Sequence, residues 1–159
     1  MALIERANRD NWQHVATLIG EFVEKYPWKF ETDKDVIVNN LYEMIDEPHV
    51  FIGLMNKDEG IFIGSIKESI ITVGMVGEEI LLYVRKSSQG TLFDLVKAFV
   101  SFCKLKKARA IHMALPKKTR ALERLGFNAY EYSYIRILDE SFCVHDRNDP
   151  NEQTQRLIS

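Results

Sequence analysis

Few residues in this chain have the type and spacing that chemistry requires. The adjacent Glu78 and Glu79 precede the apolar run ILLYV, His112 lies between two apolar residues of a later run, and tyrosines recur at positions 130, 132 and 134. A carboxylate or an imidazole can take a proton from a substrate. Three rings on one face of a strand can stack on bases or on substrate rings. Each set also has a structural interpretation. Such glutamates are often only solvated, a lone histidine in a strand is more often a satisfied sheet residue, and aromatic residues suit strands.

No standard catalytic or metal-binding motif accompanies these residues. The sequence contains no GxxxxGK[ST], GxSxG, HExxH or GxGxxG pattern, and its two cysteines, Cys103 and Cys143, belong to no cluster with metal-ligand spacing. Cys103 falls on the apolar face of a predicted helix, where a buried thiol is unreactive. The sequence therefore predicts no metal site and no disulfide framework.

Charges are segregated along the chain, although the net charge is only −2. Residues 1–96 carry nine basic and sixteen acidic groups, residues 97–124 carry nine and one, and residues 125–159 carry three and six. The basic segment could attract a phosphate-bearing partner, either a nucleotide cofactor or a nucleic acid. Lysines often only solvate a surface, so a nucleic-acid partner is an alternative that we do not favour.

The size and composition predict one domain with a real core. The chain has 159 residues, of which 46% are hydrophobic and 11% aromatic, which excludes disorder for the body of the chain. Its apolar stretches are interrupted well before the roughly 20 residues that a bilayer span needs, and the first residues lack a signal pattern. We therefore expect a soluble, cytoplasmic protein without a membrane partner.

Hydrophobic periodicity predicts an alternation of strands and helices. Asp10, with Gln13 three residues later, predicts a capping box for the first helix, and Thr32 or Asp33 begins the second. The turn at 57–60 predicts a hairpin, and Gly74–Gly77 predicts another turn. The predicted strands are 2–7, 49–55, 61–73, 79–84, 110–115 and 127–138, and the predicted helices are 10–26, 32–45, 92–104 and 116–126.

This order predicts a mixed sheet. The strand–helix–strand unit at 79–115 implies a right-handed crossover with parallel strands, whereas the hairpins imply antiparallel pairing. The continuous apolar run at 79–84 is typical of a central strand buried on both faces. We expect a single domain over residues 1–138. Residues 139–159 are polar and predict a tail that could dock on a protein partner.

A family resemblance rests on two segments. Leu82-Tyr83-Val84 leads into a helix, and ALERLGF closes a short helix before the last strand, an arrangement over residues 2–138 that resembles the GNAT superfamily of N-acyltransferases. The resemblance implies an α/β (α+β) fold, with a mixed, mostly antiparallel sheet flanked by about four helices. It also implies an acyl-CoA-dependent N-acyltransferase that moves an acetyl group from acetyl-CoA to an amine of a small molecule or protein.

The resemblance also implies where the coenzyme binds. In that family, main-chain groups of the strand hold the pantetheine, and backbone N–H groups at the next helix N-terminus hold the diphosphate. The corresponding residues here are Leu82, Val84, Arg85, Lys86, Gln89, Gly90, Thr91 and Leu92. Gln89 and Gly90 match the family's Arg/Gln-Gly-x-Gly-x-Gly/Ala loop, whereas Leu92 and Asp94 replace its small residues. Without a ligand, Thr91 and Asp94 would form an approximate capping box.

Catalytic roles follow from the same resemblance. Glu78 or Glu79 lies where the family often places its base, which can act through water, and we choose Glu79. The Val84 N–H could stabilise an oxyanion. The tyrosine that the family places four residues before Gly-Phe is Leu122 here, so Tyr83 and Tyr134 are the candidates to protonate the departing thiolate. Trp28 and Phe30 would border the acceptor. The alternative is a catalytically inactive scaffold of this fold that serves as a binding or assembly module and could contact nucleic acid.

Overall fold

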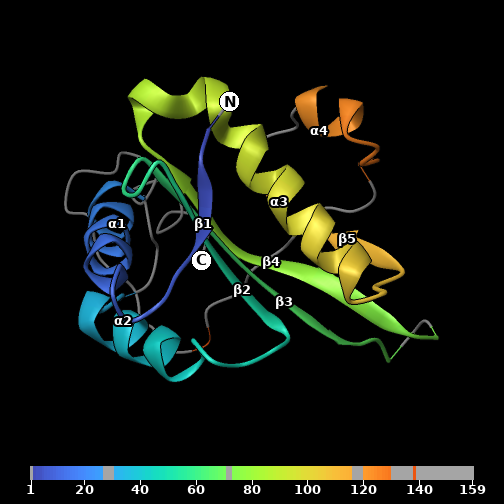
Figure 1. Ribbon diagram of the computed structural model, residues 1–159, viewed down its shortest axis with the longest axis horizontal. Helices are drawn as coiled ribbons and strands as arrows, with labels where there is room; N and C mark the ends of the chain where they lie inside the picture. The colour runs from blue at the N-terminus through green and yellow to red at the C-terminus, as the bar shows by residue number, and fades with distance from the viewer. Residues whose placement is uncertain (1, 27–30, 71–72, 116–119, 130–137, 139–159) are drawn as a thin grey trace, which may run out of the picture.

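One mixed sheet organises the protein. The computed structural model describes residues 2–26, 31–70, 73–115, 120–129 and 138 (Figure 1). The described strands form one sheet in the order β1-β2-β3-β4-β5, in which only the β4–β5 pair is parallel. The elements are β1 (Ile4–Arg6), α1 (Trp12–Lys25), α2 (Lys34–Glu43), β2 (Val50–Met55), β3 (Gly60–Glu68), β4 (Met75–Val84), the 3₁₀ helix η1 (Lys86–Thr91), α3 (Leu92–Leu105), β5 (Ala110–His112) and α4 (Arg120–Arg124).

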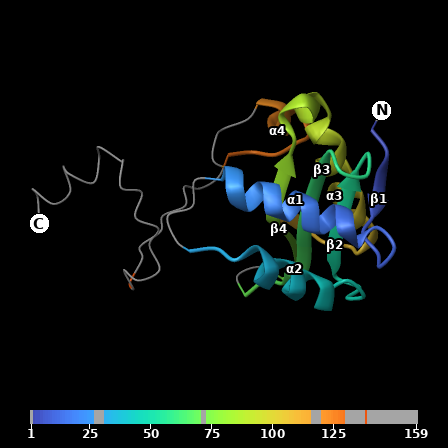
Figure 2. The same ribbon diagram turned by 90° about the vertical axis from the view of Figure 1, so that its left-hand side faces the viewer.

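Helices cover both faces of the sheet. Helices α1 and α2 lie on one face and α3 lies on the other (Figures 1 and 2). Each face has its own hydrophobic cluster, one built on Leu18, Ile61 and Ile63 and the other on Phe62 and Phe99. Because successive strand residues point to opposite faces, β3 contributes to both clusters. The predicted α/β (α+β) class and mixed sheet are confirmed.

The caps of the first two helices differ from each other. Helix α1 begins after Asn11 rather than Asp10, and no side-chain hydrogen bond caps it. The reason is local: the Asn8 and Asn11 side chains accept hydrogen bonds from main-chain N–H groups of the preceding loop, so the predicted Asp10 capping box is wrong. In α2 the predicted cap is confirmed, because the Asp33 carboxylate accepts from the N–H groups of Asp35 and Val36.

The hairpin between β2 and β3 is confirmed, whereas the next turn lies elsewhere. Strand β3 ends at Glu68, and the chain reverses before Met75, with Gly74 at a φ of +111°. Gly77 is therefore not a turn residue. It is buried within β4, where a Cβ atom would lie 2.5 Å from the Cys103 sulfur, so the close approach of α3 requires glycine there.

Strand β4 is covered on both faces, as its apolar sequence predicts, but among the described strands it is not the middle one. The central position belongs to β3, and β4 is the fourth of the five described strands. Leu81 and Val84 are buried, but Ile80 is 51% exposed. Both faces are covered as predicted, since Leu81 lies in the cluster on the α1 face and Val84 lies in the cluster on the α3 face. Strand β5 pairs with β4 only over Val76–Glu78, which leaves the rest of β4 with one described neighbour.

The second half of the described chain follows the predicted order. Helix α3 buries the predicted face, and Cys103 is buried there with its pKa raised to about 11 by desolvation. Gly126, at a φ of +86°, ends the turn after α4, where the Phe127 N–H donates to the Leu122 carbonyl. Residues 127–129 are not in a strand. The rest of the predicted last strand, except Leu138, and the predicted tail lie outside the described residues.

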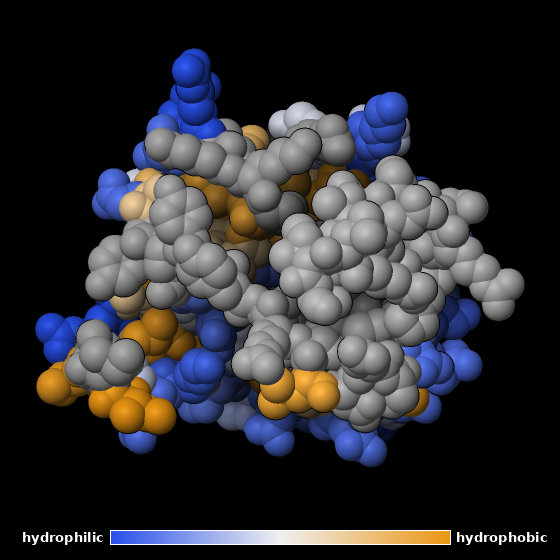
Figure 3. All heavy atoms as spheres, turned by 180° about the vertical axis from the view of Figure 1, so that it is seen from behind, coloured by the Kyte–Doolittle hydropathy of each residue, from blue (hydrophilic) through white to orange (hydrophobic). Residues whose placement is uncertain are grey.

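The described residues have neither the features that a membrane span requires nor those that a metal site requires. None of the described helices is both long and apolar enough to cross a bilayer, and the described part of the chain holds no group of three or more side chains suited to a metal ion. On the face shown in Figure 3, hydrophobic side chains reach the surface as separate patches among hydrophilic ones.

The close approach of α3 to the sheet gives a stability prediction. A Cβ atom at Gly64 would lie 2.5 and 2.6 Å from two carbons of the Phe99 ring. We expect Gly64→Ala to lower the free energy of unfolding by about 1–3 kcal/mol, because the buried ring has little room to shift. Urea denaturation measures the effect. The matched control is Gly90→Ala, where a Cβ atom meets nothing within 4 Å; equal losses in both variants would contradict the packing argument.

Candidate active site

A β-bulge in β4 opens the sheet at the predicted site. Ile63 pairs with Leu81 and Gly64 pairs with Glu79, so Ile80 is an extra residue on the β4 side. A bulge bends its strand and disrupts the ladder locally. The β4–β5 pairing ends at Glu78, immediately before the bulge. The parallel strands β4 and β5 are therefore paired only on the N-terminal side of the bulge in β4.

The bulge leaves main-chain groups of β4 on an open edge. The Arg85 N–H donates to the Glu59 carbonyl at 2.9 Å, which continues the β3–β4 ladder past Val84. Because successive residues of an antiparallel pair alternate in direction, the main-chain groups of Tyr83 face β3, and those of Leu82 and Val84 face the opposite edge. Within the described ranges, no strand or loop pairs with that edge at Leu82 or Val84.

The chain then enters a short 3₁₀ helix that leads directly into α3. Thr91 Oγ1 donates to the Ser88 carbonyl at 2.8 Å, and the Asp94 carboxylate accepts from the Ala2 N–H at 3.4 Å. The predicted Thr91–Asp94 capping box is therefore wrong, because each side chain bonds elsewhere. Leu92 is partly buried against the hydrophobic cluster of Phe62 and Phe99 on the α3 face, called here the α3 cluster. Gly90 is exposed with open space beside it.

Glu79 lies at the opening between β4 and β5. Its carboxylate accepts a hydrogen bond from the Ala114 N–H at 3.3 Å, just beyond the end of β5. Burial raises the pKa of Glu79, against smaller opposing effects of that hydrogen bond and of the charge of His112. The neighbouring Glu78 instead forms an ion pair with Lys67 of β3. Of the two adjacent glutamates, Glu79 is thus the one that lies at the opening, and its partial burial disfavours the charged form of its carboxyl.

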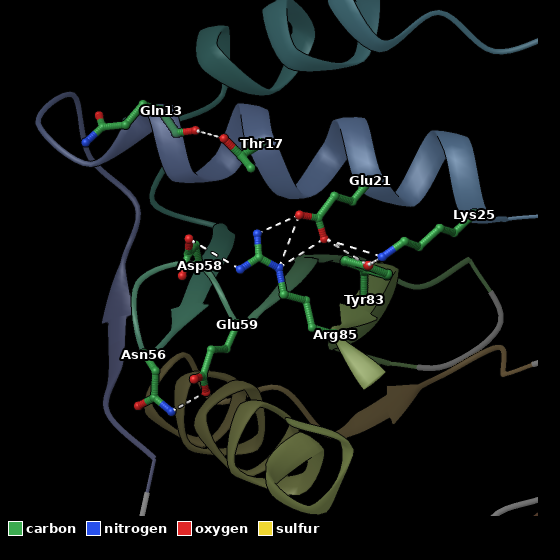
Figure 4. A network of polar contacts seen from close by, with 9 residues as sticks. All are labelled: Gln13, Thr17, Glu21, Lys25, Asn56, Asp58, Glu59, Tyr83 and Arg85. Carbon is green, nitrogen blue, oxygen red and sulfur yellow. Dashed lines mark hydrogen bonds and ion pairs between the residues drawn. The ribbon is translucent and has the colours of Figure 1, made fainter. Parts of the chain in front are cut away.

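A cluster of polar side chains lies on the side of β4 that faces α1. The Glu21 carboxylate accepts from Arg85 Nη2 at 2.5 Å and Nε at 3.1 Å, and from the Tyr83 hydroxyl at 3.0 Å (Figure 4). Lys25 Nζ donates to the Tyr83 hydroxyl at 3.2 Å and lies 3.9 Å from Glu21. Arg85 also lies 3.4 Å from Asp58. These contacts link α1 to β4 and to the β2–β3 turn.

The ionisation of this group follows from its contacts. The hydrogen bond from Arg85 is the largest effect on Glu21 and lowers the pKa of that carboxyl. The Tyr83 hydroxyl raises the pKa of Lys25, and Glu21 raises the pKa of Arg85. All three groups therefore stay charged at neutral pH. Such a closed set of partners holds side chains in place rather than exchanging protons with a substrate.

The structure separates the predicted site residues into groups. Leu82 and Val84 lie on the open edge, Glu79 lies beside the opening, and Tyr83 and Arg85 lie on the α1 face. Lys86 is exposed in the loop. Tyr134, Trp28 and Phe30 lie outside the described residues.

Sequence reasoning missed Glu21. The available signal was its spacing, because Glu21 and Lys25 stand at i and i+4 on the polar side of a predicted helix and so lie on one face. Nothing in that spacing indicates that the carboxylate reaches across to Tyr83 and Arg85, which follow about 60 residues later.

Comparison with solved structures identifies the fold. An acetyltransferase from Trypanosoma brucei aligns over 87% of this chain and all of its own, with 17% identity and a TM-score of 0.67. An aminoglycoside N-acetyltransferase in complex with CoA aligns over 86% of this chain and 94% of its own (16% identity, TM-score 0.65). A GNAT family acetyltransferase from Staphylococcus aureus aligns over 86% and 98% (14% identity, TM-score 0.65).

The chain therefore has the fold of the GNAT acetyltransferases, as its sequence predicts. The likeness is one of architecture, since the identities are 14–17%. No protein-family model matches the sequence, and no curated protein matches it.

The burial of Glu79 predicts a pH dependence of stability. Its raised pKa means that the folded protein holds this proton to a higher pH than the unfolded chain, whose pKa lies near 4.5. Wild-type stability should therefore fall as the pH rises from about 4.5 through the folded pKa. Glu79→Gln removes this titration. In urea denaturation, the free energy of unfolding of the variant relative to that of the wild type should therefore increase between pH 4 and pH 7. A constant difference would contradict the assignment.

Proposed function

We propose that the protein is an acyl-CoA-dependent N-acyltransferase that transfers an acetyl group from acetyl-CoA to an amine of a small molecule or protein. The observation that carries the proposal is the open edge of β4, where Leu82 and Val84 present main-chain groups with no described partner beside a bulge. A pantetheine arm carries amide groups that can pair with such an edge. The solved structure of the same fold with CoA supports this choice of ligand.

The loop after β4 is the proposed site for the coenzyme's diphosphate. Backbone N–H groups at the start of a helix favour anions, and Lys86 adds a positive charge. Gly90 leaves room for a ligand, since nothing lies within 4 Å of where its Cβ would be. Gln89, Thr91 and Leu92 would contribute main-chain groups. Arg85 would act indirectly, because Glu21 and Asp58 already hold its guanidinium.

Glu79 is the proposed general base. A carboxylate whose pKa is raised is a stronger base than an ordinary one, and it can accept the proton that an ammonium acceptor must lose before its nitrogen attacks. The N–C bond then forms as the C–S bond breaks, and the Val84 N–H stabilises the charge that develops on the carbonyl oxygen. The thiolate takes up a proton at the end of the transfer.

The residue that would supply this proton is the part of the proposed site that departs from the family pattern. Leu122 packs in the α3 cluster and has no proton to donate. Tyr83 and Tyr134 are the proposed donors. The Tyr83 hydroxyl donates to Glu21 and accepts from Lys25, so it could pass on a proton only by changing partners.

A catalytically inactive scaffold is the second candidate, and one observation favours it. The Asp94 carboxylate lies in the first turn of α3, where it would repel a diphosphate. Such a scaffold would bind a protein through residues 139–159. It could also bind nucleic acid through exposed basic residues such as Lys104, Lys107 and Arg109, which we do not favour. For either candidate we propose a cytoplasmic location, since the buried free thiol of Cys103 suits a reducing compartment.

Calorimetric titration with CoA and acetyl-CoA at low salt tests the proposal directly. We expect binding by the wild type, and CoA release when acetyl-CoA is supplied with a panel of amines. Glu79→Gln should bind CoA as the wild type does but lose about 10²–10⁴-fold in kcat, because only the proton acceptor is removed. Absence of binding at millimolar CoA would overturn the enzymatic proposal and leave the scaffold.

The charge of Asp94 gives an independent prediction. If the diphosphate binds at the start of α3, Asp94→Asn should tighten CoA binding about threefold to tenfold, because it removes a repulsion worth about 1 kcal/mol. The gain should shrink as salt is added. The control is Asp35→Asn, which removes the acidic residue from the first turn of α2. Equal effects of the two variants would place the diphosphate elsewhere.

A further inference from the structure

We propose that Glu21 is a positioning residue that fixes the end of β4 and the entry of the coenzyme loop through Arg85 and Tyr83. This inference rests on the proposed function, because its consequence is measured as coenzyme affinity. One carboxylate on α1 bonds Tyr83 in β4 and Arg85 immediately after its end. These two residues alternate with Leu82 and Val84, whose main-chain groups face the open edge.

Glu21 has no capacity left to recognise a substrate. Both carboxylate oxygens accept from Arg85, and Oε2 also accepts from Tyr83 and faces Lys25. Its side chain is only 23% exposed. A carboxylate with this many donors is committed to the structure around it, and the Arg85 contact through Nε and Nη2 adds directional control that a single ion pair lacks.

Arg85 is anchored at both its main chain and its side chain. Its N–H bonds the Glu59 carbonyl, and its guanidinium bonds Glu21 and approaches Asp58. Glu59 in turn accepts from the Asn56 side chain at 2.7 Å within the same β2–β3 turn (Figure 4). Since η1 begins at the next residue, Lys86, these contacts set the direction in which the loop leaves the sheet.

Tyr83 fixes the residues on either side of it. Its ring packs in the cluster beneath α1, and its hydroxyl bonds Glu21, so the residue is held on the α1 face. Leu82 and Val84 consequently keep their side chains toward α3 and their main-chain groups in the plane of the sheet. Without the carboxylate, Tyr83 would lose its acceptor and Arg85 its main partner, and the edge and the loop could shift together. A displacement of about 1 Å is enough to weaken a preorganised site severely.

The test is the CoA affinity of Glu21→Gln, measured by calorimetric titration beside thermal unfolding. Glutamine keeps the shape of the side chain but removes the charge that holds Arg85. We expect the Kd for CoA to rise about tenfold, because the edge and the loop that would hold the coenzyme lose their fixed position. The matched control is Glu24→Gln, an exposed glutamate of the same helix that should leave the Kd unchanged.

A double mutant separates positioning from a general loss of stability. Arg85→Lys keeps the charge but loses the two-pronged contact, so it should raise the Kd by a similar factor, and Glu21→Gln/Arg85→Lys should be no worse than either single variant. If the wild type binds CoA and Glu21→Gln binds it with the same Kd, this inference is overturned and the proposed function is not. Fully additive effects of the two changes would also overturn this inference. No binding by the wild type would overturn the proposed function and this inference together.

Discussion

The parting of β4 from β5 is the constraint on which the rest of the site depends. Parallel pairing stops at Glu78, and the extra residue Ile80 breaks the β3–β4 register immediately afterwards. An unpaired strand edge next to buried structure normally costs free energy, because main-chain groups lose hydrogen bonds. Here the same break in pairing lies beside the edge at Leu82 and Val84, the half-buried carboxyl of Glu79 and the start of the 86–91 segment.

A second interaction offsets this weakness. Where β5 no longer supports β4, Glu21 of α1 holds Tyr83 and Arg85 from the neighbouring face, and Asp58 and Glu59 hold Arg85 from the β2–β3 turn. Within the described residues, the open edge is thus flanked by this polar group rather than by another strand.

The departures of the sequence from the family's loop have a partial structural explanation. Leu92 packs against the α3 cluster, so its side chain contributes to the core. Asp94 bonds the Ala2 N–H and ties the start of the chain to the first turn of α3. Both residues stabilise the region that would hold the diphosphate, although the charge of Asp94 opposes that ligand. The proposed diphosphate site therefore carries a negative charge in the first turn of α3.

The sequence by itself determined the elements, because hydrophobic periodicity, the Asp33 cap, the 57–60 turn and the glycine at 126 act over a few residues. Only the tertiary structure decided the order of the described strands, that Ile80 is a bulge, and that Glu21 meets Arg85. These depend on strand register and on contacts between residues about 60 positions apart, which leave no local pattern. A run such as ILLYV records that its residues are apolar, but how far β5 extends beside it is decided by the packing of the whole sheet.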